Sequence, residues 1–380
     1  MPRVLFVLDF FPPHVGGAET LFDNLTKSLA ALGVEVAVLT QKLPGTRSFE
    51  ISENRRIYRV YSPIRHSFSI AAAKKCIELS RNVDIVHAST LGGLATVMLV
   101  GRFIKKPVVA TVFEVWDRLF LRLQKPPVSI INYAIENLSL AYYKNSFCVA
   151  ISKATRNAMI ERGFDGKKVS VIYPGIRKGL FNTKTAPATN VRGRKILFFG
   201  RPGVAKGVGY LIHSMPIVKK SVPDAKLILL LSKRPVGEYK KIVGLIKKLR
   251  LEKDVILLDP RPVGELPGII RSAEVCVVPS VSEGFGFSAA ESLSCGTPVV
   301  ASAVGSLPEI VKHGYNGFLS APESPGSIAE NVIKVLSDRK LRRRLAANAP
   351  GSVKVFDWME SAKKYVKIYK SVLKWQKKWK

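Results

Sequence analysis

Hydrophobic positions along the chain follow two alternating patterns. Short runs rich in Val, Ile and Leu, typical of strands covered on both faces of a sheet, alternate with longer stretches that have the spacing of amphipathic helices. In the first half, the runs predict strands at 3–8, 34–39, 84–88, 107–112, 146–151 and 169–173. The stretches at 17–32 and 70–81 predict helices. Such alternation of strand and helix predicts a parallel sheet.

The pattern stops at 182–190 and then begins again. This segment has few apolar residues and many turn formers, so we expect a linker there. Strands are predicted beyond it at 195–200, 226–231, 254–258, 274–279 and 298–302. Two alternating series predict an α/β protein with two doubly wound, Rossmann-like domains. We expect domains at 1–183 and 194–352, and a helix over 353–380 that crosses back to the first domain and ends in a basic tail.

Length and composition agree with this organisation. The chain has 380 residues, about twice the usual domain length, and 47% of them are apolar, which is enough for two cores. The first apolar run is interrupted by Asp9 and is better interpreted as a buried strand than as a signal peptide. The apolar runs at 91–104 and 128–143 contain Arg102 and Glu136 and are shorter than the ~18–20 residues that span a bilayer. No membrane-spanning segment is expected.

Cysteine and histidine usage indicates neither disulfides nor a metal site. The four cysteines lie far apart with no C-x-x-C pair, and the five histidines are isolated. We therefore expect a cytoplasmic protein with reduced thiols and no zinc site.

The charge is extreme. There are 60 Lys and Arg residues against 28 Asp and Glu, a net charge of +32. This indicates an anionic partner, such as a phosphate-rich substrate, a membrane surface or a nucleic acid. The alternative is the charged surface of a heat-adapted protein, although such surfaces are usually rich in Glu as well. No nucleic-acid-binding motif is recognised, so we do not expect a nucleic-acid partner.

The first candidate site follows the strand at 195–200. The chain continues as Gly200-Arg201-Pro202-Gly203-Val204-Ala205-Lys206-Gly207 and then as an apolar helix. Ligands bind beyond the carboxyl ends of parallel strands, where a glycine-rich turn and a helix start favour phosphate. Arg201 and Lys206 add two cations. Taken alone the signal is weak, because the spacing matches neither the Walker motif nor G-x-G-x-x-G.

A second candidate site follows the strand at 274–279. Glu283 stands in a glycine-containing loop, and Gly286, Phe287 and Ser288 are expected to open a helix whose N–H groups suit an anion. Glu291 lies on that helix, where its carboxylate is placed to accept hydrogen bonds from a ribose diol. Ordinary helix capping is the alternative, but capping does not require the second glycine.

With these residues in view, the chain resembles the retaining glycosyltransferases of the GT4 group, which have the GT-B fold. Glu283 to Glu291 matches the E-x7-E signature of that group, and Gly200-Arg201 with Lys206-Gly207 matches its diphosphate clamp. Further matching segments are Pro13-His14-Val15-Gly16-Gly17-Ala18-Glu19, Asp84-Ile85-Val86-His87, Ile151-Ser152-Lys153, Ser170-Val171-Ile172-Tyr173-Pro174-Gly175-Ile176 and Gly296-Thr297-Pro298-Val299-Val300-Ala301. The resemblance covers nearly the whole chain.

The resemblance implies a role for each matching residue. Arg201 and Lys206 would neutralise the leaving diphosphate of a nucleotide-sugar donor, helped by the N–H groups of Gly286 and Phe287, and Ser288 would also bind the donor. Glu291 would hold the ribose and Glu283 the donor sugar. The other donor contacts it implies are Gly16 and Gly17, from the facing domain across a central cleft, and Arg261, near the base. No cofactor is implied, and because the chain contains no Asp-x-Asp, no metal is expected.

One position departs from the pattern. Many members carry a histidine where this chain has Phe113, followed by Glu114. The role of that histidine is either absent from this chain or is taken over by Glu114 or His87. A buried core position for His87 is the alternative.

The acceptor is indicated by charge alone. A net charge of +32 favours an anionic acceptor at a membrane, such as a polyprenyl-phosphate-linked glycan or an acidic lipid. Residues 361–380 contain eight lysines with four aromatic residues and no acid, which fits an interfacial anchor at the inner face of the membrane. A helix that packs back on the first domain is the alternative. A GT-B-fold nucleotide-sugar epimerase and a non-catalytic sugar-binding relative remain rival functions.

Overall fold

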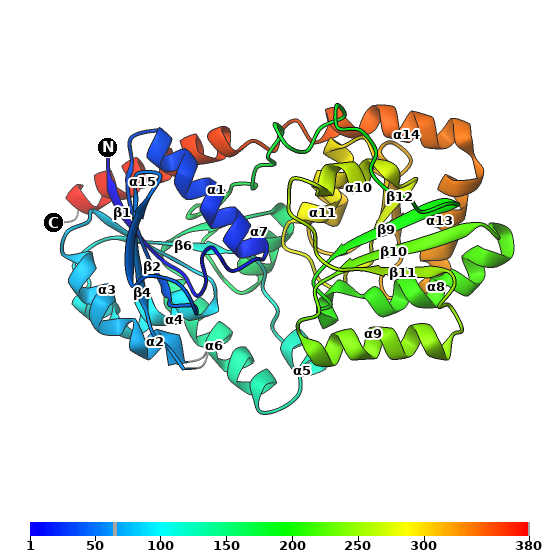
Figure 1. Ribbon diagram of the computed structural model, residues 1–380. Coiled ribbons are helices and arrows are strands. Elements are labelled where there is room, and N and C mark those ends of the chain that lie inside the picture. Colours follow the sequence, from blue (N-terminus) through cyan, green and yellow to red (C-terminus); the bar gives the residue numbers. More distant parts are fainter. Residues whose placement is uncertain (64–66, 379–380) are drawn as a thin grey trace. The chain divides into compact units, whose positions relative to one another are not determined.

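The chain forms two compact units. The computed structural model describes residues 1–63 and 67–378 (Figure 1). The first unit contains Met1–Gly175 and Phe356–Lys380, and the second contains Ile176–Val355. The segment predicted as a linker, 182–190, lies within the second unit. There the backbone N–H of Ala188 donates to the carbonyl of Gly268 at 2.9 Å, so this irregular segment is held against the unit by the main chain.

The first unit is built on an eight-stranded sheet in the order β3-β4-β2-β1-β5-β6-β7-β8. Its strands pair in parallel except for β3 with β4. The strands are β1 (Arg3–Val7), β2 (Glu35–Gln41), β3 (Phe49–Ser52), β4 (Arg55–Val60), β5 (Ile85–Ser89), β6 (Val108–Val112), β7 (Phe147–Ala150) and β8 (Val169–Val171). The helices and the 3₁₀ turn are α1 (Gly17–Ala31), α2 (Phe68–Ala71), α3 (Ala73–Ser80), α4 (Leu91–Val100), η2 (Gly101–Phe103), α5 (Leu119–Leu123), α6 (Val128–Tyr143), α7 (Lys153–Glu161) and α15 (Trp358–Lys378).

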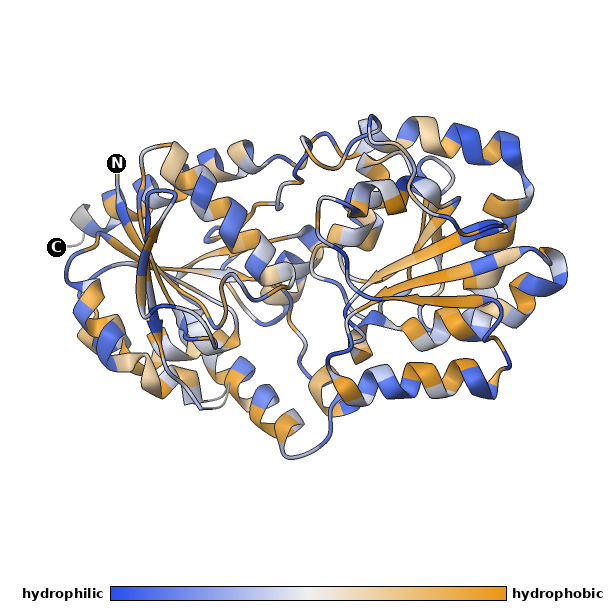
Figure 2. Ribbon diagram, viewed as in Figure 1, coloured by the Kyte–Doolittle hydropathy of each residue, from blue (hydrophilic) through white to orange (hydrophobic). Residues whose placement is uncertain are grey.

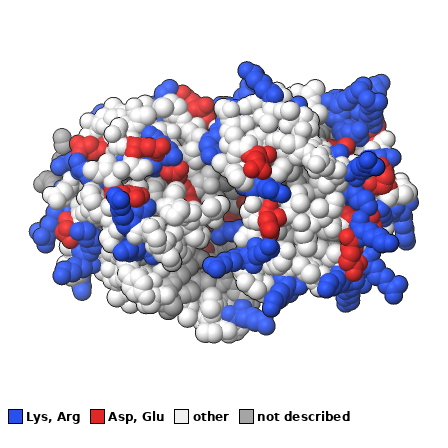
Figure 3. All heavy atoms as spheres, viewed as in Figure 1, with Lys and Arg blue, Asp and Glu red and all other residues white. Residues whose placement is uncertain are grey.

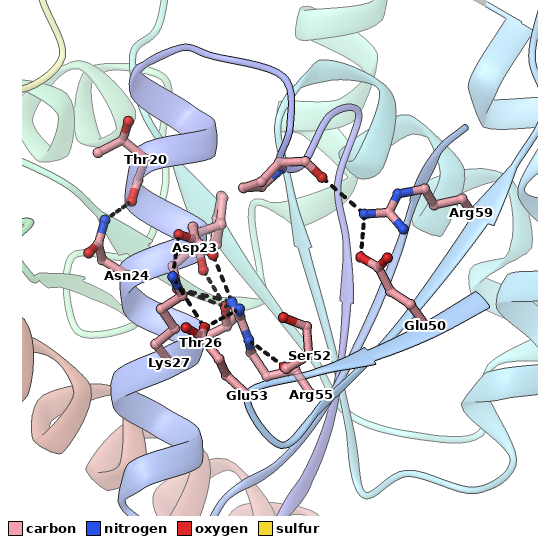
Figure 4. A network of polar contacts seen from close by, with 12 residues as sticks. Thr20, Asp23, Asn24, Thr26, Lys27, Glu50, Ser52, Glu53, Arg55 and Arg59 are labelled. Atoms are coloured by element: carbon pink, nitrogen blue, oxygen red, sulfur yellow. Dashed lines mark hydrogen bonds and ion pairs between the residues drawn. The ribbon is translucent and has the colours of Figure 1, made fainter. Parts of the chain in front are cut away.

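The hairpin of β3 and β4 is a feature that the apolar pattern did not predict. Its turn uses Glu53 and Asn54, both with positive φ, as a tight hairpin requires. The hairpin is joined to α1 by the guanidinium of Arg55, which is nearly fully buried and bonds to Asp23 at 2.9 Å and Glu53 at 2.7 Å (Figure 4). Burying a charge requires such partners. The network therefore fixes the edge of the sheet against α1.

The C-terminal helix α15 packs on the first unit. It contacts α1, and its residues Tyr365 and Tyr369 are buried. Their hydroxyls meet Thr111 at 3.1 Å and His87 at 2.7 Å, so these two aromatic rings belong to the core of the unit. The exposed lysines of the helix include Lys364, Lys367 and Lys370. Trp379 and Lys380, part of the predicted interfacial tail, lie outside the described residues, as do the side chains of Lys377 and Lys378.

The second unit is built on a six-stranded parallel sheet in the order β11-β10-β9-β12-β13-β14. The strands are β9 (Arg194–Gly200), β10 (Ala225–Leu231), β11 (Val255–Leu258), β12 (Val275–Val278), β13 (Val299–Ser302) and β14 (Gly317–Ser320). This is the strand order of a doubly wound nucleotide-binding fold. The order reverses between β9 and β12, which pair in parallel with Cys276 opposite Leu197. Crevices at such reversal points bind ligands in this class of fold.

Helices cover both faces of the second sheet. In Figure 1, α8 and α9 lie on one face and α10 and α11 on the other. The helices and the 3₁₀ turn are η3 (Val204–Lys206), α8 (Val208–Ser221), α9 (Val236–Lys248), α10 (Leu266–Ser272), α11 (Phe287–Ser294), α12 (Leu307–Ile310), α13 (Pro325–Ser337) and α14 (Arg339–Ser352). The strands are hydrophobic over most of their length, with charged residues such as Arg194, Lys195 and Lys226 near their starts (Figure 2), as expected for strands covered on both faces.

The structure also describes the thiols, the helix lengths and the surface charge that the sequence analysis considered. Cys76, Cys148, Cys276 and Cys295 are all buried free thiols. No helix among residues 1–63 and 67–378 is long and apolar enough to cross a bilayer. Lys and Arg side chains outnumber acids on the face shown in Figure 3, with a dense group over α14, where Arg339, Lys340, Arg343 and Arg344 are exposed.

Candidate functional site

The loop after β9 is held in one conformation by a glycine. Gly207, which precedes α8, has φ +63°, and a Cβ atom there would lie 1.9 Å from the carbonyl oxygen of Pro279. The position therefore requires glycine on two grounds, backbone conformation and space. The backbone N–H of Val281 also donates to the carbonyl of Ala205 at 2.8 Å. The loops after β9 and β12 are thus joined directly.

Across these two loops, Lys206 and Glu283 form an ion pair. Nζ of Lys206 lies 2.7 Å from Oε2 of Glu283, which also accepts a hydrogen bond from the hydroxyl of Ser280 at 3.0 Å. The lysine side chain is 36% exposed and the glutamate 11%. The ammonium group of Lys206 is therefore accessible to an anion from solvent, while the Glu283 carboxylate is largely buried and bonded to Ser280.

Arg201 stands at the start of the same loop. It is exposed and makes no ion pair with any described residue. Its guanidinium is a second cation at the carboxyl end of β9.

The helix α11 begins at the end of the loop that carries Glu283. Gly286 has φ +92° and directly precedes Phe287, the first residue of α11. Phe287 and Ser288 occupy the first turn, where backbone N–H groups have no partner within the helix and the helix dipole is positive. The sequence prediction of a helix start at these residues is confirmed.

A third loop supports this arrangement and was missed at the sequence level. Ser306, after β13, donates its hydroxyl to the carbonyl of Phe285 at 2.7 Å and its N–H to that of Glu283 at 3.1 Å. Gly305 allows the approach, since a Cβ there would lie 2.1 Å from the Glu283 carbonyl oxygen. The signal that identifies these residues is their place: they follow the next parallel strand at the same sheet edge.

Glu291 lies on α11, one turn beyond Phe287. Desolvation raises the pKa of its carboxyl group to about 8, and the positive charge of Arg177 acts in the opposite direction. No described residue forms an ion pair or hydrogen bond with its carboxylate. A carboxyl group with these properties needs a hydrogen-bonding partner, and a ligand hydroxyl would supply one.

Arg261 lies farther along the same edge. It is exposed and follows β11, the outermost strand of the sheet. The second unit thus joins Lys206 to Glu283 beside the start of α11, with Arg201 at the carboxyl end of β9 and Arg261 after β11, two strands from β9.

The remaining predicted residues belong to the first unit. Gly16 and Gly17 stand at the start of α1 and follow His14, whose Nδ1 lies 2.9 Å from Glu19. The loop is also fixed by Arg59, labelled in Figure 4, whose guanidinium donates to the Pro12 carbonyl at 3.0 Å.

His87 occupies the core position that the sequence left as an alternative. It is fully buried, with Nδ1 2.7 Å from the Tyr369 hydroxyl and Nε2 2.7 Å from the Thr111 hydroxyl. Burial lowers the pKa of its imidazole to about 3. Both ring nitrogens are used inside the unit, so the ring has no polar atom left for a ligand.

Phe113 and Glu114 replace the histidine pattern with packing contacts. The ring of Phe113 meets that of Phe22 on α1 edge-on, with centroids 5.7 Å apart. Glu114 accepts a hydrogen bond from the indole N–H of Trp116 at 2.9 Å. Within residues 1–63 and 67–378, no group of three or more His, Cys, Asp or Glu side chains is placed to hold a metal ion.

Two protein-family models match this chain, one in each half. The model described as Glycosyltransferase Family 4 matches residues 15–178, and that described as Glycosyl transferases group 1 matches residues 182–351. An uncharacterized glycosyltransferase of Methanocaldococcus jannaschii is 33% identical over 393 residues, covering 97% of this chain and 98% of that protein.

Two solved structures share the fold over almost the whole chain. Sucrose-phosphate synthase from Thermosynechococcus elongatus superimposes with a TM-score of 0.83 at 22% identity, covering 98% of this chain and 99% of that one. Anabaena HepE in complex with UDP and glucose superimposes with a TM-score of 0.80 at 20% identity, covering 98% and 100%. At these identities the likeness concerns the fold.

Proposed function

Because this chain belongs to the group 1 glycosyltransferases of family 4 and has the GT-B fold, we propose that it transfers a sugar from a nucleoside-diphosphate donor with retention of anomeric configuration. The observation that carries the proposal is the joined pair of loops after β9 and β12, with Arg201, Lys206, Glu283 and the start of α11 at the reversal point of the sheet.

The leaving group is the part of the reaction that these residues serve. When the bond between sugar and diphosphate breaks, negative charge develops on the phosphate oxygens. Arg201, Lys206 and the N–H groups at the start of α11 oppose that charge without needing to reorganise. We propose that they neutralise it without a divalent metal, so EDTA should leave the rate unchanged. Lys206 would exchange Glu283 for the diphosphate, which turns the Glu283 carboxylate to the hydroxyls of the donor sugar.

The nucleoside is assigned to the remaining polar groups. Glu291 would accept hydrogen bonds from the ribose, which supplies the partner that its desolvated carboxyl group lacks. Arg261 would lie near the base, and Gly16 and Gly17 would contact the donor from the first unit. HepE, a structural neighbour, binds UDP and glucose, so UDP-sugars are the first donors to try.

The acceptor is proposed from charge. A net charge of +32 favours an anionic acceptor, and we propose a sugar or glycan linked to a phosphorylated lipid at a membrane surface. A membrane-bound acceptor would place the protein at the cytoplasmic face as a peripheral protein.

Thermal stabilisation by a panel of nucleotide sugars tests the proposal. A ligand that binds the native state raises the melting temperature by mass action, so the true donor should stabilise the wild type and fail to stabilise Arg201→Ala. Stabilisation without transfer or hydrolysis would favour a non-catalytic relative. Conversion of the donor to its epimer would favour an epimerase. Retention is read from the anomeric configuration of the product by NMR.

A further inference from the structure

The helix α6 has an apolar side that is exposed at the surface of the first unit. Its buried positions include four polar residues, Ser129, Asn132, Glu136 and Ser139, beside Leu140 and Tyr143, which pack in the hydrophobic core of the unit. Its exposed positions are apolar throughout: Val128, Ile130, Ile131, Ala134, Leu138, Ala141 and Tyr142. A helix that borders water normally exposes polar and charged residues instead.

Two of the buried polar residues of α6, Asn132 and Glu136, have hydrogen-bond partners inside the unit. Both oxygens of the Glu136 carboxylate accept hydrogen bonds from the backbone N–H of Trp116, at 3.0 and 3.1 Å, and one also accepts from that of Asp117 at 2.7 Å. The amide of Asn132 donates to the side chain of Gln124 at 2.8 Å. Asn132 and Glu136 therefore hold the preceding segment in place, while the apolar exposed side of α6 faces outward.

The exposed apolar residues lie on one side of the helix. Ile131, Ala134, Leu138 and Tyr142 are spaced by three or four positions, which places them one above another on a helix. Leu138 is 61% exposed and Ile130 55%. No charged residue interrupts this side between Val128 and Tyr143.

Neighbouring elements enlarge the surface. Exposed Leu121 lies on α5, which packs on α6. Exposed Leu99 and Phe103 lie on α4 and η2, and Tyr142 lies over η2, since a Cβ at Gly101 would be 1.8 Å from its hydroxyl oxygen. We call the group the α6 surface; its members are Leu99, Phe103, Leu121, Val128, Ile130, Ile131, Leu138 and Tyr142.

Cations occur around this surface in excess of acids. The exposed cations of the segments that form or flank it are Arg102, Lys105, Arg118, Arg122, Lys125 and Lys144. Of the acids between positions 99 and 145, Glu136 is buried, Asp117 pairs with Arg162 at 2.5 Å, and Glu114 bonds to Trp116. An apolar centre with a cationic rim has the composition of a surface that binds anionic lipid.

We infer that the α6 surface docks on an anionic lipid bilayer, with its apolar side chains entering the headgroup region and the surrounding cations contacting lipid phosphates. The inference deepens the proposed function, since it names the surface that would bring a lipid-linked acceptor to the enzyme. A second copy of the chain is a poorer occupant, because a two-fold contact brings both cationic rims together. Within α15, Tyr365 and Tyr369 are buried and therefore not available to lipid, which leaves the α6 surface as the better anchor.

Flotation with lipid vesicles tests the inference without donor or acceptor, so its failure would leave the transfer reaction unaffected. The vesicles are phosphatidylcholine alone, or phosphatidylcholine and phosphatidylglycerol in equal parts. The key variants are Ile131→Ser and Leu138→Ser. The matched control is Ile51→Ser, which changes an exposed isoleucine on β3, the strand at the opposite edge of the first unit's sheet from β8. Arg122→Gln and Lys125→Gln test the rim, and deletion of 373–380 tests the tail.

The wild type should float with the anionic vesicles far more than with the neutral ones. Ile131→Ser and Leu138→Ser should each weaken binding roughly tenfold, the scale for one inserted apolar side chain. Ile51→Ser should bind as the wild type does, and each rim variant should lose about fivefold. Unchanged melting temperatures would show that the variants fold, as expected for exposed positions.

Other outcomes would overturn the inference. If the wild type floats with neither kind of vesicle, or if Ile131→Ser and Leu138→Ser float as well as Ile51→Ser, the α6 surface does not bind lipid. If only the deletion of 373–380 abolishes flotation, the tail is the anchor. If sedimentation without lipid shows a dimer that Leu138→Ser dissociates, the occupant is a second copy.

Discussion

Nζ of Lys206 lies 2.7 Å from Oε2 of Glu283, although 77 residues separate the two in the sequence. The strand order brings them together, because β9 pairs with β12 and their loops leave the same edge of the sheet. The lysine is partly exposed, so screening by water limits what the pair contributes to stability to less than about 1 kcal/mol. The pair therefore matters more for binding than for folding.

Loss of either cation should reduce catalysis far more than stability. Lys206→Ala and Arg201→Ala should each lower turnover by ~10²–10³, the scale for one preorganised charge donor, and should weaken donor binding as well. Steady-state kinetics and calorimetric titration with the donor measure the two effects. Lys241→Ala is the control, since that lysine is exposed on α9 and pairs with Glu238. Near wild-type rates for both site variants would place the diphosphate elsewhere.

Gly207 and Gly203 provide a matched pair of substitutions in one loop. Gly207→Ala should destabilise the protein by more than ~1 kcal/mol and abolish donor binding, because the new Cβ would meet the Pro279 carbonyl and the residue has positive φ. Gly203→Ala should be nearly neutral, since nothing lies within 4 Å of its Cβ position and its φ is −83°. Chemical denaturation gives both free energies of unfolding. Equal effects would mean that the loop rearranges freely.

Glu291 should make stability depend on pH in the direction opposite to most carboxylates. Its pKa is raised from 4.5 to about 8 in the folded protein, so the folded state binds the proton more tightly than the unfolded state. Its contribution is full below about pH 4.5 and is lost as the pH rises through 8. The melting temperature of Glu291→Gln should therefore fall less over this range than that of the wild type. Glu252→Gln, at an exposed carboxylate, should follow the wild type. Parallel curves for all three proteins would contradict the raised pKa.

The contact between Tyr369 and His87 should be structural. Tyr369→Phe removes the hydroxyl that meets the buried Nδ1 of His87 and should cost about 1–3 kcal/mol, the range for leaving a buried polar atom unpaired. Tyr61→Phe, at an exposed ring, should cost nothing measurable. Thermal unfolding tests this, and donor affinity should be unchanged in both variants. If Tyr369→Phe lowers the affinity for the donor without lowering the stability of the fold, His87 has a role in donor binding.

The pKa of His87 adds a pH test of the same contact. Since burial lowers it from 6.5 to about 3, the unfolded state binds the proton more tightly. Stability contributed by the neutral imidazole is present above about pH 6.5 and is lost as the pH falls towards 3. His87→Gln should start from a lower stability at neutral pH but lose less of it on acidification, as measured by thermal unfolding between pH 7 and 4.

Several features of the fold could be predicted from the pattern of residues. Continuous apolar runs such as 226–231 gave the central strands, because strands covered on both faces exclude polar residues. The hairpin at Phe49–Val60 was missed, since it lies at a sheet edge and its strands carry Arg55, Arg56 and Arg59 among the apolar residues. The exposed apolar side of α6 was also missed. Its apolar run was visible, but periodicity does not tell which side of a helix faces the core.

The sequence by itself determined the two α/β series, the family, and the residues of the two glycine-containing loops. These features depend on the backbone preferences and charges of residues that are close together in the chain. Only the tertiary structure decided which of these residues meet. It brought Lys206 to Glu283 through the pairing of β9 with β12, and it placed Gly305 and Ser306 behind them. It also enclosed His87 between Tyr369 and Thr111. Burial and long-range contacts depend on how distant segments pack, and the same residue types in the same local pattern are compatible with either outcome.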